Sequence, residues 1–590
     1  MSPSLVRVLV LAGAAALLAL PPLAAQQPRP VALASAAQAQ ADSVRALRRA
    51  RNAQADFERL RFRHLPETWD SGSGGYCDEV IGRFCLWHDD GDDEEWAPPP
   101  EHRAVEAGRD RLLATLAEAA RAAPGDAWIA GQRVRYLLEA GRAAEAAQAA
   151  RECRAQRWWC LALEGYAHHA GGAYAPADAA FTAAVEAMPA RRQREWSDLA
   201  PVLPDADARA LRRLDPETRA ARVRRLWWLA DPLWMEPGND RKTEHYARLV
   251  ADELQDRARS TEGLAWGDDL REILLRYGEP IGWEKVRPRA GAATFGTASV
   301  VTHYAPSGRE YLPPVRRLED PTAVDSSDWT REDYETRTAY VPGYASRVHD
   351  LRHQVAVFRR GGAAVVVAAW RLDPDSLPPS PRIRAGLVLA RDEQAAPVLA
   401  VSEGMGLTGA LRVTAEPAAT VMSLEVREDS SKRIGRARYG LRLAPAPAGV
   451  SLSDLLLLAD GEARPGSLEA AVPLARGDTR FRAGEQVGLY WEVYGLQGRT
   501  DTLTVTLTLA RRGAGWMRRA AERVGLAAES APVRMRWREE PAGGEVAPRS
   551  LGVALPRLAP GAYLLEVTVQ AHGAEPAVAT RELIVEAAPR

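Results

Sequence analysis

The sequence predicts an α+β multidomain protein, in which helical hairpins and a small mixed domain are followed by two antiparallel β-sandwiches. Three observations predict this fold class. An alanine-rich segment, 101–190, has apolar residues at helical spacing and carries a repeat. A second helical segment, rich in tryptophan, extends to about residue 335. From about Tyr340 the apolar period changes to two, in short runs separated by turn residues.

The N-terminus has the pattern of a secretory signal peptide over residues 1–25. Arg7 precedes the apolar run Val8–Leu20, and small residues follow at Ala24 and Ala25. The run is too short to span a bilayer as a helix; a buried N-terminal helix is the alternative interpretation. No cysteine follows the run, and no later stretch reaches the roughly 20 apolar residues of a membrane helix. We therefore expect an exported protein, periplasmic or secreted, without a transmembrane segment or a lipid anchor.

The charge balance bears on the class of partner. The chain has 77 lysines and arginines against 78 aspartates and glutamates, so no overall field recruits an acidic substrate or nucleic acid. We expect no nucleic-acid partner.

Residues 26–100 are expected to form an N-terminal helix followed by a disulfide loop and an acidic loop, with a proline-rich linker at the end. Export favours two short-range disulfides, Cys77–Cys85 and Cys153–Cys160. A four-cysteine zinc site is the alternative, but neither pair has the internal spacing of a zinc ribbon. The acidic run 88–96 lacks the spacing of a calcium loop, so we interpret it as a solvated loop rather than a calcium site.

Residues 101–190 resemble tetratricopeptide-type helical hairpins, and a plain helical bundle is the alternative. The residues at repeat spacing are Gly165, Ala177, Phe181, Ala184 and Pro189. Stacked hairpins of this type form a groove that usually binds other polypeptides. Only two copies are recognisable, fewer than the three needed for independent stability, so we expect packing against neighbouring segments to stabilise these helices.

Residues 191–335 are expected to form a small helical or mixed domain, whose most distinctive stretch is "GLAWGDDLREILLRYGEP" (263–280). An aspartate before the helix 270–277 can cap its free N–H groups. A glycine follows the helix where a left-handed residue is needed, and a proline then prevents continuation. We interpret the stretch as a structural corner. Its residues are Trp266, Asp268, Asp269, Tyr277, Gly278 and Pro280.

The same corner has a catalytic alternative, because acids beside a tryptophan are typical of sugar-cleaving sites. The acids are Asp268, Asp269, Glu272 and Glu279. The sequence contains no nucleophile elbow, phosphate-binding loop or zinc-protease helix. His349 and His353 are spaced to share one face of an element, but no third ligand accompanies them, so we expect no metal site and no cofactor.

The C-terminal part is expected to form two immunoglobulin-like β-sandwiches, 340–445 and 446–590. Seven short runs rich in valine and leucine make the first set, and six make the second. "LTVTLTL" alternates apolar residues with threonine, which is typical of a strand with one wet face. The basic insertion 513–526 is interpreted as a loop helix that covers a sheet edge, with docking on a membrane surface as the alternative.

The order of motifs from Asp231 to the C-terminus resembles the GWxTD-domain family, exported bacterial proteins of largely unknown function. The counterparts are "DPLWMEPGNDRKTEHY" (231–246), "AWGDD" (265–269) and "RYGEP" (276–280). Ala265, Asp268 and Glu279 depart from the family pattern, whereas Trp266 and Asp269 keep it. The family has no established catalytic residues, so the resemblance implies none here.

The sequence therefore favours a non-enzymatic interaction protein of the bacterial envelope, which binds unknown protein partners through the helical groove or the sandwich loops. Two alternatives stay open. One is a hydrolase of envelope polysaccharide or peptide that uses the acids near Trp266. The other is a carbohydrate-binding sandwich, in which exposed tryptophans or tyrosines form a stacking platform for a glycan.

Overall fold

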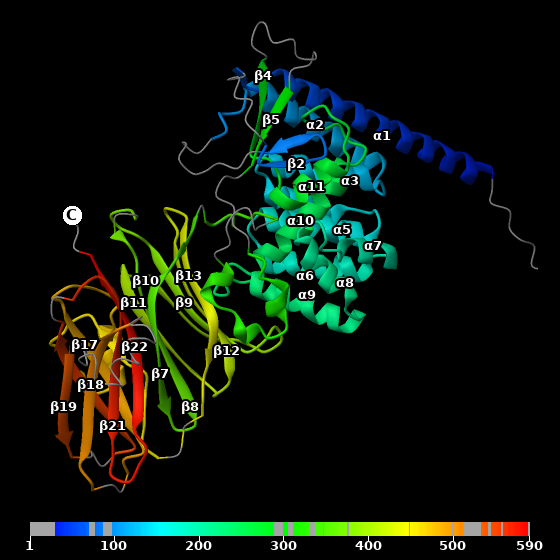
Figure 1. Ribbon diagram of the computed structural model, residues 1–590. Helices are drawn as coiled ribbons and strands as arrows, with labels where there is room; N and C mark the ends of the chain where they lie inside the picture. The colour runs from blue at the N-terminus through cyan, green and yellow to red at the C-terminus, as the bar shows by residue number, and fades with distance from the viewer. Residues whose placement is uncertain are drawn as a thin grey trace, which may run out of the picture.

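A computed structural model shows helices at one end of the molecule and two β units at the other (Figure 1). It describes residues 30–69, 77–86, 97–287, 299–304, 311–329, 337–345, 347–374, 377–445, 447, 449–497, 500–512, 533–540, 544–555 and 558–587. The expected signal peptide, the acidic run 88–96 and the basic insertion 513–526 lie outside the described residues.

The first six helices form three consecutive antiparallel pairs. They are α1 (Pro30–Arg63), α2 (Arg103–Ala122), α3 (Ala127–Glu139), α4 (Ala143–Glu152), α5 (Arg157–Ala170) and α6 (Tyr174–Ala187). Each member of a pair packs on the next helix in the chain. The sequence repeat revealed only the second and third pairs, and α1 with α2 supplies the third hairpin that such a stack needs. The start of α1 projects beyond the other helices (Figure 1).

Five more helices complete the helical part: α7 (Ala190–Trp196), α8 (Asp205–Arg213), α9 (Pro216–Ala230), α10 (Asp240–Gln255) and α11 (Asp268–Tyr277). One hydrophobic core runs through all of them, from Ala46 on α1 to Leu275 on α11, and reaches Tyr340. The core is therefore continuous across residue 190, where the sequence predicted a domain boundary.

The long amphipathic helix α10 lies against α3, α5 and α6. Gln132 on α3 donates to the Leu254 carbonyl at 2.6 Å, and Lys242 lies 2.6 Å from Asp178 on α6. The apolar side of α10 is therefore buried on the second and third hairpins. Binding of a partner polypeptide along the hairpins stays a prediction.

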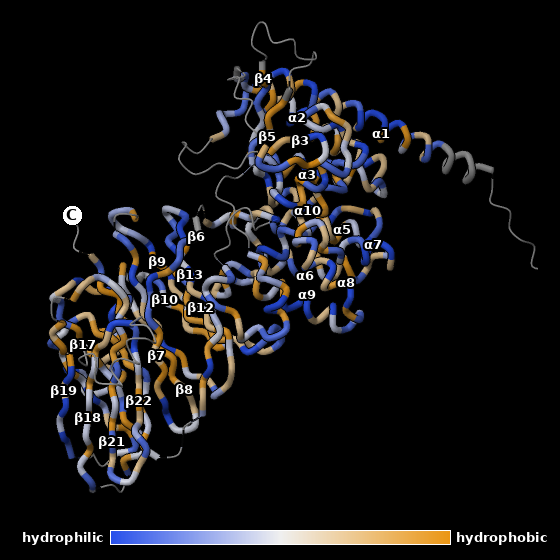
Figure 2. Tube along the Cα trace, viewed as in Figure 1, coloured by the Kyte–Doolittle hydropathy of each residue, from blue (hydrophilic) through white to orange (hydrophobic). Residues whose placement is uncertain are grey.

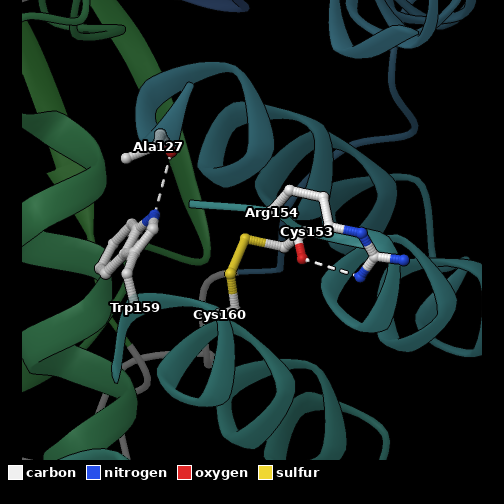
Figure 3. Close-up of a disulfide and its surroundings, with 5 residues drawn as sticks. All are labelled: Ala127, Cys153, Arg154, Trp159 and Cys160. Carbon is white, nitrogen blue, oxygen red and sulfur yellow. Dashed lines mark hydrogen bonds between the residues drawn. A yellow bond between two sulfur atoms is a disulfide. The ribbon is translucent and has the colours of Figure 1, made fainter. Parts of the chain in front are cut away.

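Both expected disulfides are present. Cys77 and Cys85 join the ends of a hairpin made of β2 (Glu79–Ile81) and β3 (Phe84–Leu86), and the other bridge, Cys153–Cys160, joins the end of α4 to the start of α5 (Figure 3). Beside the second bridge, Trp159 donates its indole N–H to the Ala127 carbonyl at 2.9 Å. A small sheet, β1 (Glu67–Trp69), β4 (Gly282–Arg287) and β5 (Ser299–His303), lies next to the helices. Three short 3-10 helices follow: η1 (Val315–Leu318), η2 (Pro321–Ala323) and η3 (Ser326–Trp329).

The first β unit packs two sheets face to face. The larger sheet has the order β10 (Val398–Met405), β9 (Ile383–Ala390), β12 (Ala419–Glu428), β13 (Arg433–Arg442) and β6 (Arg347–Asp350). The smaller sheet has the order β11 (Thr408–Ala415), β8 (Ala363–Arg371) and β7 (Arg352–Arg360). Trp370, Leu387 and Leu424 are fully buried between them.

The second β unit also has two sheets, mostly antiparallel. The first is β14 (Ser451–Leu452), β15 (Leu456–Leu458), β17 (Gln486–Tyr494) and β20 (Val546–Ala554), and the second has the order β16 (Arg480–Arg482), β22 (Ala577–Glu586), β21 (Gly561–Gln570), β18 (Leu503–Arg511) and β19 (Val533–Glu539). Along β18, Leu503, Val505 and Leu507 are buried and the threonines between them are half-buried, as the alternation predicted. Each of the short runs predicted as strands forms one.

The two β units share an apolar interface. Strand β8 is buried on both faces, which is why its sequence is a continuous apolar run and not an alternating one (Figure 2). Val366 faces the core of the first unit, whereas Val367 packs with Leu456 and Tyr490 of the second. A short helix, α12 (Leu468–Ala471), with η6 (Val472–Leu474), closes this interface. Within the described ranges, no helix has the length and apolarity that crossing a membrane requires.

Candidate functional site

The structure places the disulfide hairpin directly against the corner at 263–280. The Arg83 guanidinium holds the Asp269 carboxylate from two nitrogens, at 2.5 and 2.9 Å, although the residues are 186 positions apart. A Cβ on Gly82 would lie only 2.5 Å from the Cβ of Asp269, so the hairpin turn needs glycine for this approach. Asp269 therefore fastens the hairpin to the start of α11.

The predicted side-chain cap of α11 is absent, and this corrects the interpretation of both aspartates. Gly267 occupies the cap position without a side-chain hydrogen bond, and the helix begins at Asp268, which is exposed. Among the backbone N–H groups of α11, Asp269 accepts only from that of Leu270, at 2.8 Å, because its carboxylate is directed to Arg83. Both charges still lie in the first turn, where the positive end of the helix favours them.

The other end of α11 is tied to the same hairpin. Glu79 accepts a hydrogen bond from the Tyr277 hydroxyl at 2.6 Å and two from Arg276, at 2.6 and 2.9 Å. Gly278 follows with a φ of 86°, a conformation that favours glycine. A Cβ there would lie 3.0 Å from the Arg248 guanidinium. The expectation of a positive-φ glycine at this place agrees with the structure.

Replacing Asp269 by alanine removes the ion pair with Arg83 and is expected to lower the free energy of unfolding by about 1 kcal/mol. The loss is small because about half of the Arg83 side chain is exposed to solvent. The hydrogen bond from Arg83 also holds the pKa of Asp269 well below its usual range. A lowered carboxyl pKa contributes stability above the unfolded value, near pH 3.9, that is lost as the pH falls below it. Urea unfolding at pH 7 and at pH 3 measures both effects. Asp268→Ala, at the exposed neighbour, is the matched control, and an equal loss there would contradict the assignment.

The segment 231–235, which begins the family-like motif, forms the joint between the helices and the first β unit. Arg438 on β13 and Glu425 on β12 make an ion pair of 2.9 Å in which both side chains are fully buried. Arg438 also donates to the Asp231 carbonyl at 2.6 Å and lies 4.0 Å from the centre of the Trp234 ring. Glu425 accepts from the backbone N–H groups of Trp234 and Met235.

The residues at repeat spacing lie at the contact of α5 and α6. A Cβ on Gly165 would meet the Phe181 ring within 3 Å, so the glycine lets the two helices approach. Ala177, Phe181 and Ala184 are fully buried, and Pro189 directly precedes α7. Phe181 stacks on Tyr246 of α10, with ring centres 5.5 Å apart. These residues pack the helices and do not face a ligand site.

A cleft of about 830 Å³ opens where the hairpins, the corner and the first β unit meet. It receives side chains from the α5–α6 connection, from α10, from residues 277–279, from residues 340–344 and from the β12–β13 turn. Five tyrosines line it: Tyr166, Tyr174, Tyr277, Tyr340 and Tyr344. The charged or titratable residues in the lining are His169, Glu236, Glu244, Arg248, Glu279, Arg427, Asp429 and Lys432. The volume is in the range of small-ligand sites.

One wall of the cleft is a hydrogen-bonded chain on α5 and α10. His169 Nε2 lies 2.7 Å from Glu244, and its Nδ1 lies 2.9 Å from the Thr243 hydroxyl. Glu244 also pairs with Arg248 at 2.8 Å. Burial acts to raise the pKa of Glu244, but Arg248 and His169 outweigh it and hold this pKa well below its usual range. This carboxylate is therefore charged and already neutralised by its neighbours.

Beneath that wall, the buried Asp240 accepts a hydrogen bond from the Tyr340 hydroxyl at 2.7 Å. Burial raises the pKa of Asp240 to about 6. Glu236, at the mouth of the cleft, is held by Arg384 and Arg427 of the first β unit.

Glu279 differs from the other acids of the cleft. Its carboxylate accepts from the Tyr166 hydroxyl, at 2.9 and 3.1 Å to its two oxygens. No arginine, lysine or histidine of the described chain lies within ion-pair distance of it. Burial raises its pKa. The side chain remains accessible from the cleft, so it is a carboxyl group without a cation at an open surface.

A second cavity of about 420 Å³ lies on the other side of Glu279. It shares Tyr166, Ala170, Gly278 and Glu279 with the first. Trp266 and Pro280 line it, and the Trp266 indole donates to Asp252 at 2.9 Å. The two cavities thus meet at the end of the corner.

The acids near Trp266 do not converge on one site. Asp269 is bound to Arg83, Glu272 pairs with Arg276 and Arg337, and only Glu279 reaches the cleft. Their separation follows from the helix, which directs successive side chains to different faces.

The two histidines that were expected on one element lie on different strands. His349 is on β6, and His353 is on β7 with its ring between the Leu351 carbonyl and the Tyr439 hydroxyl. The described residues contain no group of three or more metal-ligating side chains. Every tryptophan whose side chain is described is buried or half-buried, so none of them forms an exposed stacking platform.

Sequence reasoning missed most of the cleft. Tyr166, His169, Glu244 and the tyrosines at 340 and 344 belong to no recognisable motif. Because these positions are spread over the chain, no spacing in the sequence connects them.

No family model matches the chain, and no curated protein matches it. Among solved structures, a putative membrane anchored protein from Corynebacterium diphtheriae aligns with a TM-score of 0.15 and 9% identity over 40% of this chain and 59% of that one. A glycosyl hydrolase family 2 member from Bacteroides cellulosilyticus aligns with a TM-score of 0.16 and 6% identity over 38% of this chain and 27% of that one. A β-glucuronidase from Bacteroides uniformis aligns with a TM-score of 0.17 and 11% identity over 38% of this chain and 26% of that one. The chain thus spans 59% or less of each of these proteins.

Proposed function

We propose that the protein is an exported, non-enzymatic interaction protein of the bacterial envelope, and that it binds a segment of a partner polypeptide in the cleft at the end of the corner. The resemblance to GWxTD-domain proteins and the immunoglobulin-like character of the β units belong to the same proposal. The observation that carries it is the cleft itself, which three parts of the chain build together.

The architecture supports binding in the cleft rather than along the hairpins. Helix α10 packs on α3, α5 and α6, which leaves less of the hairpin surface for a partner. The cleft, in contrast, is accessible and is lined by tyrosines and charged side chains. Tyrosine is enriched at protein interfaces because its ring is apolar and its hydroxyl forms hydrogen bonds. The two disulfides fit a protein that works in an oxidising compartment.

Photo-crosslinking in the host envelope tests this proposal. A photoreactive amino acid at Val341, which is half-buried in the cleft lining, is expected to capture a discrete polypeptide. The same residue at Val578, which is 52% exposed on β22, is the matched control and should not capture it.

A second variant, Val341→Trp, fills the cleft and is expected to reduce recovery of that partner at least tenfold, with an unchanged circular dichroism spectrum. Capture from Val578 but not from Val341, or undiminished recovery with Val341→Trp, would place the binding surface elsewhere.

A further inference from the structure

One carboxylate of the cleft, that of Glu279, has no arginine, lysine or histidine of the described residues within ion-pair distance, and Arg135 attracts it only from farther away. Glu236 forms ion pairs with Arg384 and Arg427. Glu244 pairs with Arg248 and contacts His169. The Asp429 carboxylate forms an ion pair with Arg427 at 2.6 Å. Glu279 differs from these acids, because its hydrogen-bond partner among the described residues is the neutral Tyr166 hydroxyl.

Glu279 is exposed at the surface of the cleft, so its carboxylate can accept a hydrogen bond from a group that enters the cleft. The protein around it raises its pKa, which shows that the charged form gains from a nearby positive charge. The tyrosine hydroxyl satisfies part of the hydrogen-bonding capacity of the two oxygens and leaves lone pairs for a further donor. A ligand that carries positive charge would complete this arrangement.

The surroundings favour the same charge. Tyr166 donates to Glu279, and Tyr174 lies in the same lining. The other three tyrosine rings of the lining already face arginines of the chain. Aromatic faces attract ammonium and guanidinium groups through their negative quadrupole, and the attraction grows where water is partly excluded. The lining thus places a carboxylate without an ion-pair partner beside a tyrosine, the ring type that stabilises cations.

We infer that Glu279 binds the ammonium or guanidinium group of a basic side chain of the partner polypeptide, with tyrosines of the cleft around it. The inference rests on the proposed function and adds the chemical class of the group that is recognised. A charge-assisted hydrogen bond to Glu279 supplies orientation and selectivity, and Lys432 in the β12–β13 turn selects against basic residues elsewhere along the segment.

Calorimetry with three tripeptides tests the inference: acetyl-Gly-Lys-Gly-amide, its arginine analogue, and its norleucine analogue, which has the length of lysine without the charge. The wild-type protein is expected to bind the lysine or the arginine peptide at least tenfold more tightly than the norleucine peptide. Glu279→Gln keeps a hydrogen-bond acceptor for Tyr166 but removes the charge, and the preference should fall below twofold.

Glu186→Gln, at an exposed glutamate of α6 outside the cleft, is the matched control and should keep the full preference. Equal binding of the charged and neutral peptides, an unchanged preference in Glu279→Gln, or no binding of any peptide would overturn the inference. If the cross-link from Val341 persists in those cases, the proposed function stands and only the role of Glu279 fails. If the cross-link is also absent, both fail.

Discussion

Replacing Arg438 by alanine is expected to lower the free energy of unfolding by about 3–5 kcal/mol, because it leaves a buried carboxylate without its cation. Arg438 and Glu425 have no exposed side-chain surface. The same substitution removes hydrogen bonds to the carbonyls of Leu229 and Asp231 and to the Ser423 hydroxyl. Urea denaturation followed by tryptophan fluorescence measures the loss, since Trp234 lies directly beside the guanidinium.

An exposed ion pair provides the control for this result. Arg412 and Glu469 lie 3.0 Å apart with about half of each side chain exposed, so Arg412→Ala is expected to cost less than about 1 kcal/mol. The double variant Arg438→Met with Glu425→Leu should be less destabilised than the sum of its single variants. It should not regain the wild-type value, because the N–H groups of Trp234 and Met235 lose their acceptor. A loss at Arg438 no larger than at Arg412 would contradict the proposed joint.

Phe181→Ala is expected to lower the free energy of unfolding of the helical part by about 3–5 kcal/mol, the usual cost of removing a buried phenylalanine ring. The ring is fully buried, lies against Gly165 and stacks on Tyr246 of α10. Its loss leaves a cavity at the place where α10 meets the hairpins. Thermal unfolding monitored by far-ultraviolet circular dichroism provides the measurement.

The adjacent Thr182 is exposed, and Thr182→Ala on the same helix should change the free energy by less than about 0.5 kcal/mol. Removal of residues 121–190 is expected to unfold the helical part as a whole, because the hairpins and α10 share one core. A deletion of this segment that left a folded, soluble remainder would contradict the shared core.

Local patterns in the sequence predicted the elements with good success. Alternation along 503–509, the continuous apolar run of β8 and the alanine-rich hairpins depend on which faces of a single element are buried, and that information is contained in nearby residues. The same holds for the two disulfides, whose cysteines are seven and eight positions apart. The positive-φ glycine at 278 is also a local requirement of a helix end.

The partners of individual side chains were not predictable in this way. Asp269 satisfies every local criterion for a helix cap, yet a guanidinium 186 residues away takes its carboxylate and a glycine takes the cap position. Helix α10 has an ordinary amphipathic sequence, and this pattern does not indicate which helices its apolar side packs against.

The sequence by itself predicted export, the helical and β segments, the disulfides and the positions of the turns. Each of these features depends on composition or on neighbours along the chain. Only the tertiary structure decided that α10 packs on the hairpins, that Arg438 and Glu425 form a buried ion pair at the joint, and that Glu279 has no ion-pair partner in a tyrosine-lined cleft. Those facts arise from contacts between segments far apart in the sequence, and a hydrophobic pattern records that a face is buried but not what covers it.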